Sequence, residues 1–362
     1  MASQPDSGVF ENADRLEAGD RIAPFALPDS DGRPVNPLSD QLAGRPLLLV
    51  FECAGAGGGV SFEDELSALA AQRPALQAQD TLVLAVTQRR QGDNGALAES
   101  LALPFAVLSD PPAKVYASCG FDPQTVGRAT VTIALDGNLR VLGVFDGGGA
   151  TRWTEIAAAL AAVAAPEAAK PLTGHPPVLV LPRVLTPADC AELIRVWHRP
   201  VQLWQGDGFT TEGFRESDGD FKVRSADYGK VTQYLVRDPA LQRYLDAKLQ
   251  RRVLPEIQKA FQTKATRRED YRIAGYDADE DGSLGPHRDN PTKATRHRRF
   301  TFCITLNAGA FQGGGLRFRE YSEQAYLVPT GTAIVWSCAL LHEVLPITAG
   351  KRFILGTHLF GN

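Results

Sequence analysis

The pattern of hydrophobic and polar positions changes part-way along this chain. The first half begins with an apolar run at 46–51, followed by a glycine-rich turn and a helical pattern that starts at Ser61. Ser61 opens an S-x-x-D capping signal, which is typical of a helix N-terminus. We then expect a strand at 81–87 and a hairpin at 129–145 that turns at Asp136-Gly137. An apolar helix is expected at 154–165. This order predicts a βαβ-type domain with three layers.

The second half begins with helical patterns and then changes to short alternating runs. Thr186 is the expected N-cap of one helix, with Pro187 in its first turn, and a second helix is expected at 239–261. The alternating runs follow at 271–276, 299–306, 315–319, 325–328, 332–337, 342–347 and 351–359. Seven such runs at regular spacing predict an antiparallel sandwich or barrel.

The 362 residues suit two domains, since one domain usually takes roughly 100–200 residues. A Pro-rich stretch without periodicity, residues 166–177, is the expected linker. We therefore predict a flexible tail at 1–17, a first domain at 18–165 and a second domain at 178–362.

Composition excludes several classes of protein. The chain is 44% hydrophobic and 22% charged, as expected for a globular protein, and its net charge of −4 favours neither nucleic acid nor an anionic membrane as partner. No targeting segment is visible at the N-terminus, and no apolar run approaches the ~20 residues needed to span a bilayer. The five cysteines are scattered and form no C-x-x-C pair, a pattern of reduced thiols. A cytoplasmic protein is expected.

The stretch LGPHRDNP contains His287, Arg288 and Asp289. A kinase catalytic loop is excluded, because Asn290 and Pro291 follow and no D-F-G occurs downstream. The acidic stretch DADEDG just before it resembles the opening of an EF-hand calcium loop. The position of the bidentate glutamate holds Arg288 instead, which favours a solvated acidic loop over a calcium site.

A metal site agrees better with these residues. Side chains two positions apart on a strand share one face, so His287 and Asp289 offer a nitrogen and an oxygen to one point while Arg288 faces away. His342, at the start of a later expected strand, can supply a third ligand. Two histidines and one carboxylate form the facial triad of non-haem Fe(II) oxygenases, which leaves positions open for a cosubstrate and dioxygen.

A chelating cosubstrate needs an anchor for its far end. Arg352 follows His342 by ten residues, and a hairpin turning at Ala349-Gly350 would bring it back to the metal. Arginine binds carboxylates through two parallel hydrogen bonds. The spacing therefore suits a dicarboxylate held between the metal and Arg352.

The second half resembles the prolyl 4-hydroxylase-type 2-oxoglutarate, Fe(II)-dependent dioxygenases. The stretches that carry the resemblance are YDADEDGSLGPHRDNP, RRFTFCITLNAGAFQGGGLRF, PTGTAIVWSCALLHEVLPITAGKRFILGTHLF and LTPADCAELI. It implies an α+β double-stranded β-helix (jelly-roll) domain that follows an α/β first domain. It also implies that His287, Asp289 and His342 bind Fe(II), that Arg352 binds 2-oxoglutarate and that Tyr276 lines its pocket.

The same resemblance implies a reaction. Dioxygen would be consumed, 2-oxoglutarate would be decarboxylated to succinate and CO₂, and a C–H bond of the substrate would be hydroxylated, with L-ascorbate restoring oxidised iron. A prolyl or similar aliphatic group, in a small molecule or a peptide, is the substrate hypothesis.

Some positions depart from the family pattern. Leu284 replaces an aromatic residue, and Thr305 stands where some relatives bind the cosubstrate with a tyrosine. Both positions bear on the shape of the pocket, and Asp289 disfavours the halogenating variant, which lacks the carboxylate. His358 shares strand parity with Arg352, and we expect a structural role for it. The basic stretch 293–299 is expected to be a solvated loop, with steering of an acidic substrate as the alternative.

The first half resembles the peroxiredoxin (AhpC/TSA) family of thioredoxin-like folds. The resemblance rests on AGDRIAPFALPDSDGRPVNPLSDQLAGRPLLLVF, LSDPPAKVYASCGF and RATVTIALDGNLR. Arg128 matches the family, but Gly57 and Val60 stand at about the positions of the Thr-x-x-Cys motif. Cys53 lies some seven residues early and is the candidate redox thiol. We expect a non-peroxidatic domain that has a protein partner, with a thiol peroxidase or a redox-sensing or interaction protein as the alternative function.

Overall fold

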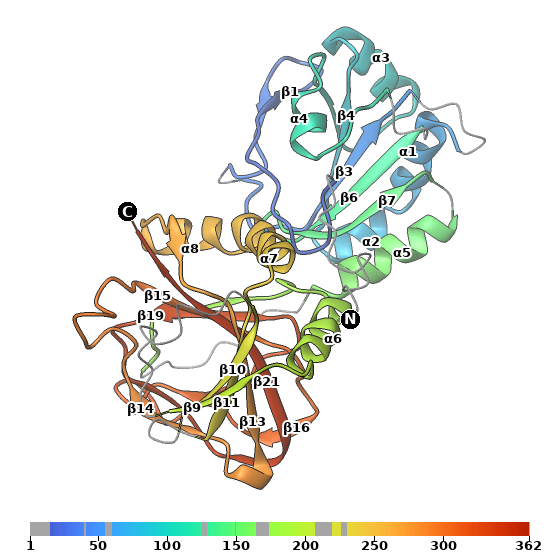
Figure 1. The fold of residues 1–362 in the computed structure, drawn as a ribbon. Helices are drawn as coiled ribbons and strands as arrows, with labels where there is room; N and C mark the ends of the chain where they lie inside the picture. The colour runs from blue at the N-terminus through green and yellow to red at the C-terminus, as the bar shows by residue number, and fades with distance from the viewer. Residues whose placement is uncertain are drawn as a thin grey trace. The chain divides into compact units, whose positions relative to one another are not determined.

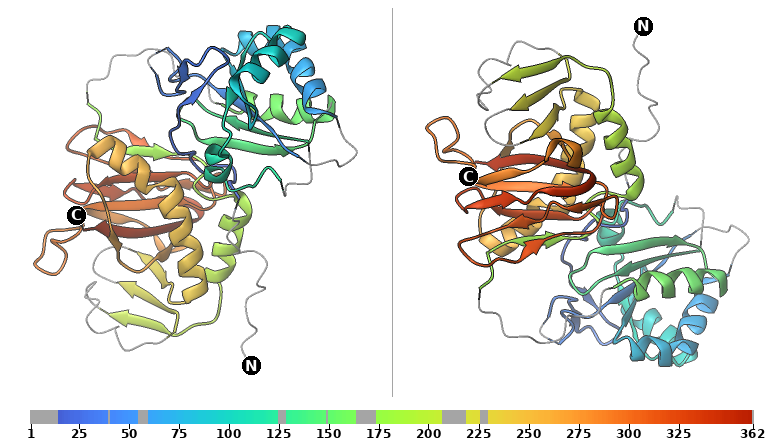
Figure 2. Two further views of the ribbon diagram at one scale, coloured as in Figure 1. Left: turned by 90° about the horizontal axis from the view of Figure 1, so that it is seen from above. Right: turned by 90° about the horizontal axis from the view of Figure 1, so that it is seen from below.

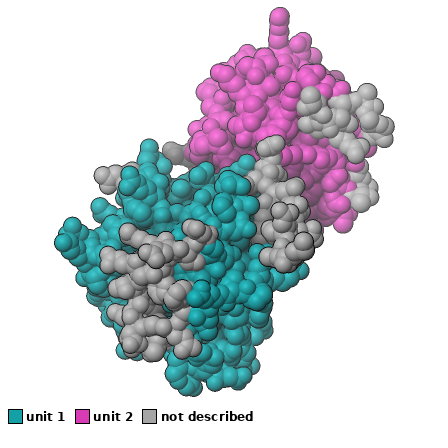
Figure 3. Space-filling model, viewed as in Figure 1, with its two compact units in different colours: residues 1–12, 169–362 teal, residues 13–168 magenta. Residues whose placement is uncertain are grey.

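The protein consists of two compact units, shown by a computed structural model. One unit comprises residues 13–168 and the other comprises residues 1–12 and 169–362 (Figure 3). The structure describes residues 15–39, 41–54, 60–124, 129–148, 150–163, 174–206, 219–225 and 230–361. No helix among these residues is both long enough and apolar enough to cross a membrane.

The unit of residues 13–168 is built on a five-stranded sheet with the order β5-β4-β3-β6-β7 (Figure 1). Its strands are β3 (Leu47–Glu52), β4 (Leu82–Thr87), β5 (Ala106–Ser109), β6 (Thr130–Leu135) and β7 (Val141–Asp146). β3, β4 and β5 run parallel, while β6 and β7 form the expected antiparallel hairpin. A two-stranded sheet precedes them, made of β1 (Leu27–Pro28) and β2 (Pro34–Val35).

Both faces of this sheet are buried. Leu47, Leu49 and Phe51 of β3 contribute to one buried cluster, whereas Leu48 and Val50 contribute to another, as the alternation of a strand requires. The helices of the unit are α1 (Phe62–Ala71), α2 (Arg73–Ala78), α3 (Gln91–Ser100), α4 (Lys114–Ser118) and α5 (Ala150–Ala161). The predicted cap of α1 is confirmed, because the backbone N–H of Asp64 donates to Ser61 Oγ over 3.0 Å.

The other unit contains two sheets. A ten-stranded sheet has the order β8-β19-β15-β21-β13-β11-β10-β9, with β12 and β16 paired to β21, and a four-stranded sheet has the order β14-β20-β17-β18. The strands of the first sheet are β8 (Leu179–Leu181), β9 (Leu203–Gly206), β10 (Phe221–Ser225), β11 (Val231–Leu235), β12 (Arg267–Arg268), β13 (Arg272–Asp277), β15 (Phe300–Thr305), β16 (Phe311–Gly313), β19 (Ala333–Ser337) and β21 (Ile347–Phe360). Those of the second sheet are β14 (Leu284–His287), β17 (Leu316–Arg317), β18 (Ala325–Tyr326) and β20 (His342–Val344).

Helices cover one face of the ten-stranded sheet (Figures 1 and 2). They are α6 (Pro187–Trp197), α7 (Pro239–Arg252) and α8 (Leu254–Phe261), and a short 3₁₀ helix, η2 (Ala278–Glu280), lies elsewhere in the unit. The predicted Thr186 cap is confirmed as a complete capping box with Asp189. The single helix expected at 239–261 is wrong, because it is divided at Val253. Pro255 explains the division, since proline has no N–H to donate to the carbonyl four residues earlier.

The opposite face of the ten-stranded sheet contributes to a second buried cluster together with the four-stranded sheet. Tyr276, Cys303 and Trp336 come from the ten-stranded sheet, while Leu316 and Val344 come from the four-stranded sheet. We call the region around this cluster the interior. Strand alternation directs the apolar side chains of β15 toward the helices and its other positions toward the interior, namely Thr301, Cys303 and Thr305.

The hairpin expected at Ala349-Gly350 is wrong. β21 runs without interruption from Ile347 to Phe360 and pairs with β16 at this point. The chain instead passes from the four-stranded to the ten-stranded sheet at Leu345 and Pro346, between β20 and β21. Gly350 accommodates a local distortion of β21, because its φ is +72° and a Cβ would lie 2.4 Å from the carbonyl oxygen of Ala310.

Candidate metal centre

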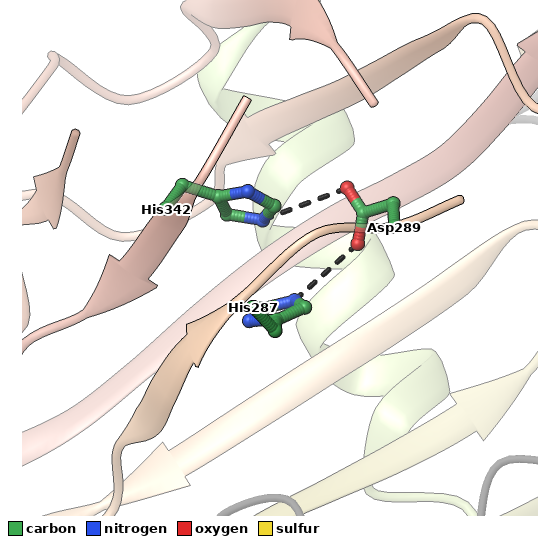
Figure 4. A group of neighbouring side chains, drawn as sticks. All are labelled: His287, Asp289 and His342. Carbon is green, nitrogen blue, oxygen red and sulfur yellow. Dashed lines mark ion pairs between the residues drawn. The ribbon is translucent and has the colours of Figure 1, made fainter. Parts of the chain in front are cut away.

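Pairing of two strands in the four-stranded sheet brings the three predicted ligands together. His287 is the last residue of β14 and His342 is the first residue of β20, and the two are register partners across the antiparallel pair. Asp289 lies in the bend two residues after His287. The three side chains point toward one another (Figure 4), and their ligand atoms lie within 4.8 Å of one another.

The hydrogen bonds of both histidines direct a nitrogen lone pair toward the carboxylate. His287 Nδ1 lies 2.8 Å from the carbonyl oxygen of Gly285, and His342 Nδ1 lies 3.0 Å from that of Leu340. A carbonyl oxygen only accepts, so each Nδ1 carries the hydrogen, and in the neutral ring Nε2 is unprotonated. The Nε2 atoms lie 3.3 and 3.5 Å from the two carboxylate oxygens of Asp289. Three acceptors therefore converge on one point, where a cation is needed to make the arrangement favourable.

The pKa values of the three residues reflect their burial and their contacts with one another. Burial would raise the pKa of Asp289, but the hydrogen bond from His287 and the charges of His342 and His358 outweigh burial and hold that pKa well below its usual range. Burial lowers the pKa of His342, whereas hydrogen bonding to Asp289 outweighs burial and raises the pKa of His287. Metal binding at these residues therefore competes with protonation of the histidines.

Asp289 is held at its backbone and at its side chain. Its N–H donates to the carbonyl of Cys338 over 3.0 Å, and its own carbonyl accepts from Arg298 Nη1 over 3.0 Å. Asp289 Oδ2 also accepts from the Thr301 hydroxyl. Sequence reasoning missed these three partners. The sequence could have indicated Thr301, because it lies four positions before Thr305 on the same predicted strand and therefore faces the same side.

Arg352 lies in the interior, on β21, and is 4% exposed. Its Nη1 donates to the carbonyl of Gly314 over 2.7 Å, while its Nε has no hydrogen-bond partner. Among the residues that the structure describes, no carboxylate lies within ion-pair distance of this guanidinium. A buried arginine charge normally has an anionic partner, so this guanidinium is suited to bind an anion.

Gly314 packs closely against Arg352. Its φ is +68°, and a Cβ at this position would lie 2.2 Å from Ile347 Cδ1 and 3.2 Å from Arg352 Cδ. A side chain at residue 314 would therefore strain the backbone, displace the end of the Ile347 side chain and press on Arg352.

Tyr276 and Cys303 are affected by the charges of both Arg352 and Asp289. Tyr276 is the register partner of Arg352, whose Cζ is 5.8 Å from the centre of the tyrosine ring. Burial raises the pKa of Tyr276 and raises that of Cys303 to about 11, while the charge of Arg352 lowers both and that of Asp289 raises both. Each side chain thus lies within electrostatic reach of both groups. Thr305 is buried on the same face of β15, and its role in binding stays a prediction.

The remaining motif residues have structural surroundings. Arg288 faces outward, as expected, and forms an ion pair with Glu320. Asp277 and Asp281 of the acidic stretch pair with Lys351 and Lys230. Within the described residues, this stretch contributes no group of ligands close enough to hold a metal ion. An EF-hand site therefore finds no support.

Two further expectations concern His358 and the basic stretch. His358 faces the interior, and burial lowers its pKa to about 3. The basic stretch is not uniformly solvated, because Arg298 is only 12% exposed and forms an ion pair with Glu269. Arg298 therefore acts on Asp289 from within the fold, while His297 of the same stretch is 43% exposed.

Comparison with known proteins identifies relatives of both halves. Residues 18–142 match the model of the AhpC/TSA family. A 77-residue stretch of the chain is 34% identical to a PKHD-type hydroxylase of Synechococcus sp. (strain JA-2-3B'a(2-13)), covering 20% of this chain and 34% of the relative. The chain thus spans about a third of the length of that curated relative.

Two solved structures are similar to parts of the chain. Peroxidoxin BcpB from Mycobacterium tuberculosis is 22% identical, with a TM-score of 0.36, over 42% of this chain and 100% of that one. A prolyl-4-hydroxylase from Pseudomonas putida is 18% identical, with a TM-score of 0.38, over 51% of this chain and 92% of that one.

The candidate thiol of the AhpC/TSA-like unit, Cys53, lies just after β3 in a buried position. Burial raises its pKa to about 12, although the nearby Arg15 guanidinium lowers it slightly. Arg15 is itself paired with Asp146. Of the other positions considered in the family motif, Gly57 and Arg128 lie outside the described residues, and Val60 is partly buried just before α1. Thiol chemistry requires a lowered pKa, so the surroundings of Cys53 oppose it.

We therefore expect Cys53 to be unreactive. A thiol with a raised pKa holds little of the thiolate that reacts with peroxides and alkylating agents. Hydrogen peroxide consumption should be equal for the wild type and Cys53→Ser, and iodoacetamide should label Cys53 far more slowly than free cysteine. Peroxide consumption that Cys53→Ser abolishes would contradict this expectation.

Proposed function

We propose that the protein is an Fe(II)- and 2-oxoglutarate-dependent dioxygenase that hydroxylates an aliphatic C–H bond. The observation that carries the proposal is the pair of incomplete sites within one interior. Three acceptors converge at His287, Asp289 and His342, and the buried guanidinium of Arg352 lacks an anionic partner. A metal ion and a dicarboxylate would complete both sites.

The donor set favours Fe(II) among the metal ions. Two imidazole nitrogens and one carboxylate leave positions open for other ligands, whereas structural zinc sites are closed by four protein ligands. Both histidines have their tautomer determined by a backbone carbonyl, as metal ligands usually do. His287 is the most exposed of the three, at 16%, so we place the access of substrate on its side.

The interior residues suit 2-oxoglutarate. Arg352 can bind the distal carboxylate through two hydrogen bonds, one of them from the Nε that has no partner in the protein. Tyr276 and Thr305 would complete the wall of this pocket, as the sequence predicted. Because the interior is lined mainly by apolar side chains, it would exclude water from the bound cosubstrate.

The bound Fe(II) would activate dioxygen for the conversion of 2-oxoglutarate to succinate and CO₂ and for hydroxylation of the substrate. The role of this chain is to bind and orient both groups, and we propose that its two sheets form the expected double-stranded β-helix for this purpose. A prolyl or similar aliphatic group remains the proposed substrate, L-ascorbate the proposed reductant and the cytoplasm the proposed location. The relative named as a PKHD-type hydroxylase supports hydroxylation as the reaction class.

The proposal is tested with the full chain under anaerobic conditions. Addition of Fe(II) and then 2-oxoglutarate should produce a weak visible charge-transfer band, and admission of oxygen should yield succinate. Asp289→Ala should show neither the band nor succinate. A fully metallated wild type without a band would refute the proposal and direct attention to the AhpC/TSA-like unit.

A further inference from the structure

Three polar groups of the interior surround the hydroxyl of Thr301. Its Oγ1 lies 3.2 Å from Cys338 Sγ and 3.3 Å from His358 Nδ1, and it is hydrogen-bonded to Asp289 Oδ2. Thr301 and His358 are register partners on β15 and β21, and Cys338 directly follows β19. Three segments of the ten-stranded sheet therefore meet at the ligand Asp289.

The ligand atoms of Asp289, Cys338 and His358 lie within 4.8 Å of one another, which is a spacing that a second metal ion could use. However, the Thr301 hydroxyl is in contact with a ligand atom of each of these residues, namely Asp289 Oδ2, Cys338 Sγ and His358 Nδ1. A metal ion bound by these three atoms would compete with the hydroxyl. These residues therefore form a hydrogen-bonded group and not a second metal centre.

The chemistry of the groups determines the direction of each hydrogen bond. An ionised carboxylate only accepts, so the single hydrogen of the Thr301 hydroxyl is donated to Asp289 Oδ2. The Thr301 oxygen must then accept from its other two neighbours. His358 therefore carries its hydrogen on Nδ1, and the Cys338 thiol is the other donor.

We propose that Thr301 is a positioning residue, oriented by His358 and Cys338, which holds the Asp289 carboxylate in the rotation that binds the metal. The inference rests on the proposed function. With Oδ2 engaged by Thr301, Oδ1 remains as the oxygen for the metal, and the carboxylate occupies one coordination position. Residues that orient metal ligands in this way usually change metal affinity about 10- to 100-fold when they are replaced.

The test measures Co(II) binding by the full chain in competition with a chromophoric chelator, and it requires no turnover. Thr301→Val, which keeps the shape of the side chain without the hydroxyl, should weaken Co(II) binding about 10- to 100-fold and alter the visible Co(II) spectrum. Thr301→Ser should restore both. Thr357→Val is the matched control, because this buried threonine of β21 donates to the carbonyl of Glu269 and should leave Co(II) affinity unchanged.

Equal Co(II) affinity of Thr301→Val and the wild type would refute the positioning role while leaving the proposed function intact. A wild type that binds no Co(II) would instead remove the proposed function itself, and this inference with it. If Thr301→Val does not fold, as judged by circular dichroism, two variants of His358 provide the test. His358→Leu should then bind Co(II) more weakly than His358→Asn, whose amide can replace the Nδ1 donor, and equal affinities would refute the proposal.

Discussion

Replacing His342 by alanine is expected to lower the affinity for Fe(II) at least about 100-fold. The metal would lose one of its three protein ligands. Structural zinc sites with four ligands have binding free energies of about 10–16 kcal/mol, or about 3 kcal/mol for each ligand, and about 3 kcal/mol corresponds to a factor of roughly 100. The fold should persist, because His342 is the first residue of a short strand and its Nδ1 contacts only the carbonyl of Leu340. Anaerobic equilibrium dialysis against Fe(II) measures the effect directly.

The matched control for this variant is His297→Ala. His297 lies on an exposed part of the same unit, and its Nε2 contacts Glu269 rather than Asp289. Its removal should leave one equivalent of Fe(II) bound with unchanged affinity. If His342→Ala also retains one equivalent at wild-type affinity, the triad is not the iron site.

Replacing Arg352 by glutamine is expected to weaken 2-oxoglutarate binding about 100-fold, with little effect on Fe(II). Loss of one partner from a desolvated charge pair costs about 2–5 kcal/mol, which corresponds to a factor of roughly 30 or more. Lysine should rescue only part of the loss, since a point charge cannot replace two parallel hydrogen bonds. Titration of the charge-transfer band with 2-oxoglutarate under anaerobic conditions provides the dissociation constants.

A ligand without the distal carboxylate makes this experiment specific. The wild type should prefer 2-oxoglutarate strongly over 2-oxobutyrate, and Arg352→Gln should lose most of that preference. Arg268→Lys is the control, because this partly buried arginine already has a carboxylate partner in Asp246 and should retain the preference. An unchanged preference in Arg352→Gln would show that the distal carboxylate binds elsewhere.

Elements with a strong local signal were predicted well. The Ser61 and Thr186 caps, the β6–β7 hairpin and the start of β20 at His342 all lie where the pattern indicated. Each depends on residues within a few positions of one another, so periodicity and capping chemistry are sufficient. Strands β9, β10 and β11 were missed, and the effect of Pro255 on the helix pattern was underestimated.

The route of Arg352 into the site was also misjudged. Glycine after alanine indicated a turn at 349–350, yet this glycine lies within a continuous strand beside β16. Positive φ is needed both in turns and in distorted strands, so the residue type alone does not distinguish them. The pairing of β16 with β21 keeps this segment extended, and such a pairing cannot be recognised in a short stretch of sequence.

By itself, the sequence determined which side chains are available for chemistry. The order of His287, Asp289, His342 and Arg352, with the absence of Thr-x-x-Cys in the first half, is a property of the chain and needs no coordinates. Only the tertiary structure decided how these groups are oriented. Strand register brings His287 beside His342, and Asp289 is held by Thr301, which lies on a different sheet from the histidine strands. Such contacts depend on which strands pair and in what register, and pairing between distant segments is decided by the whole fold.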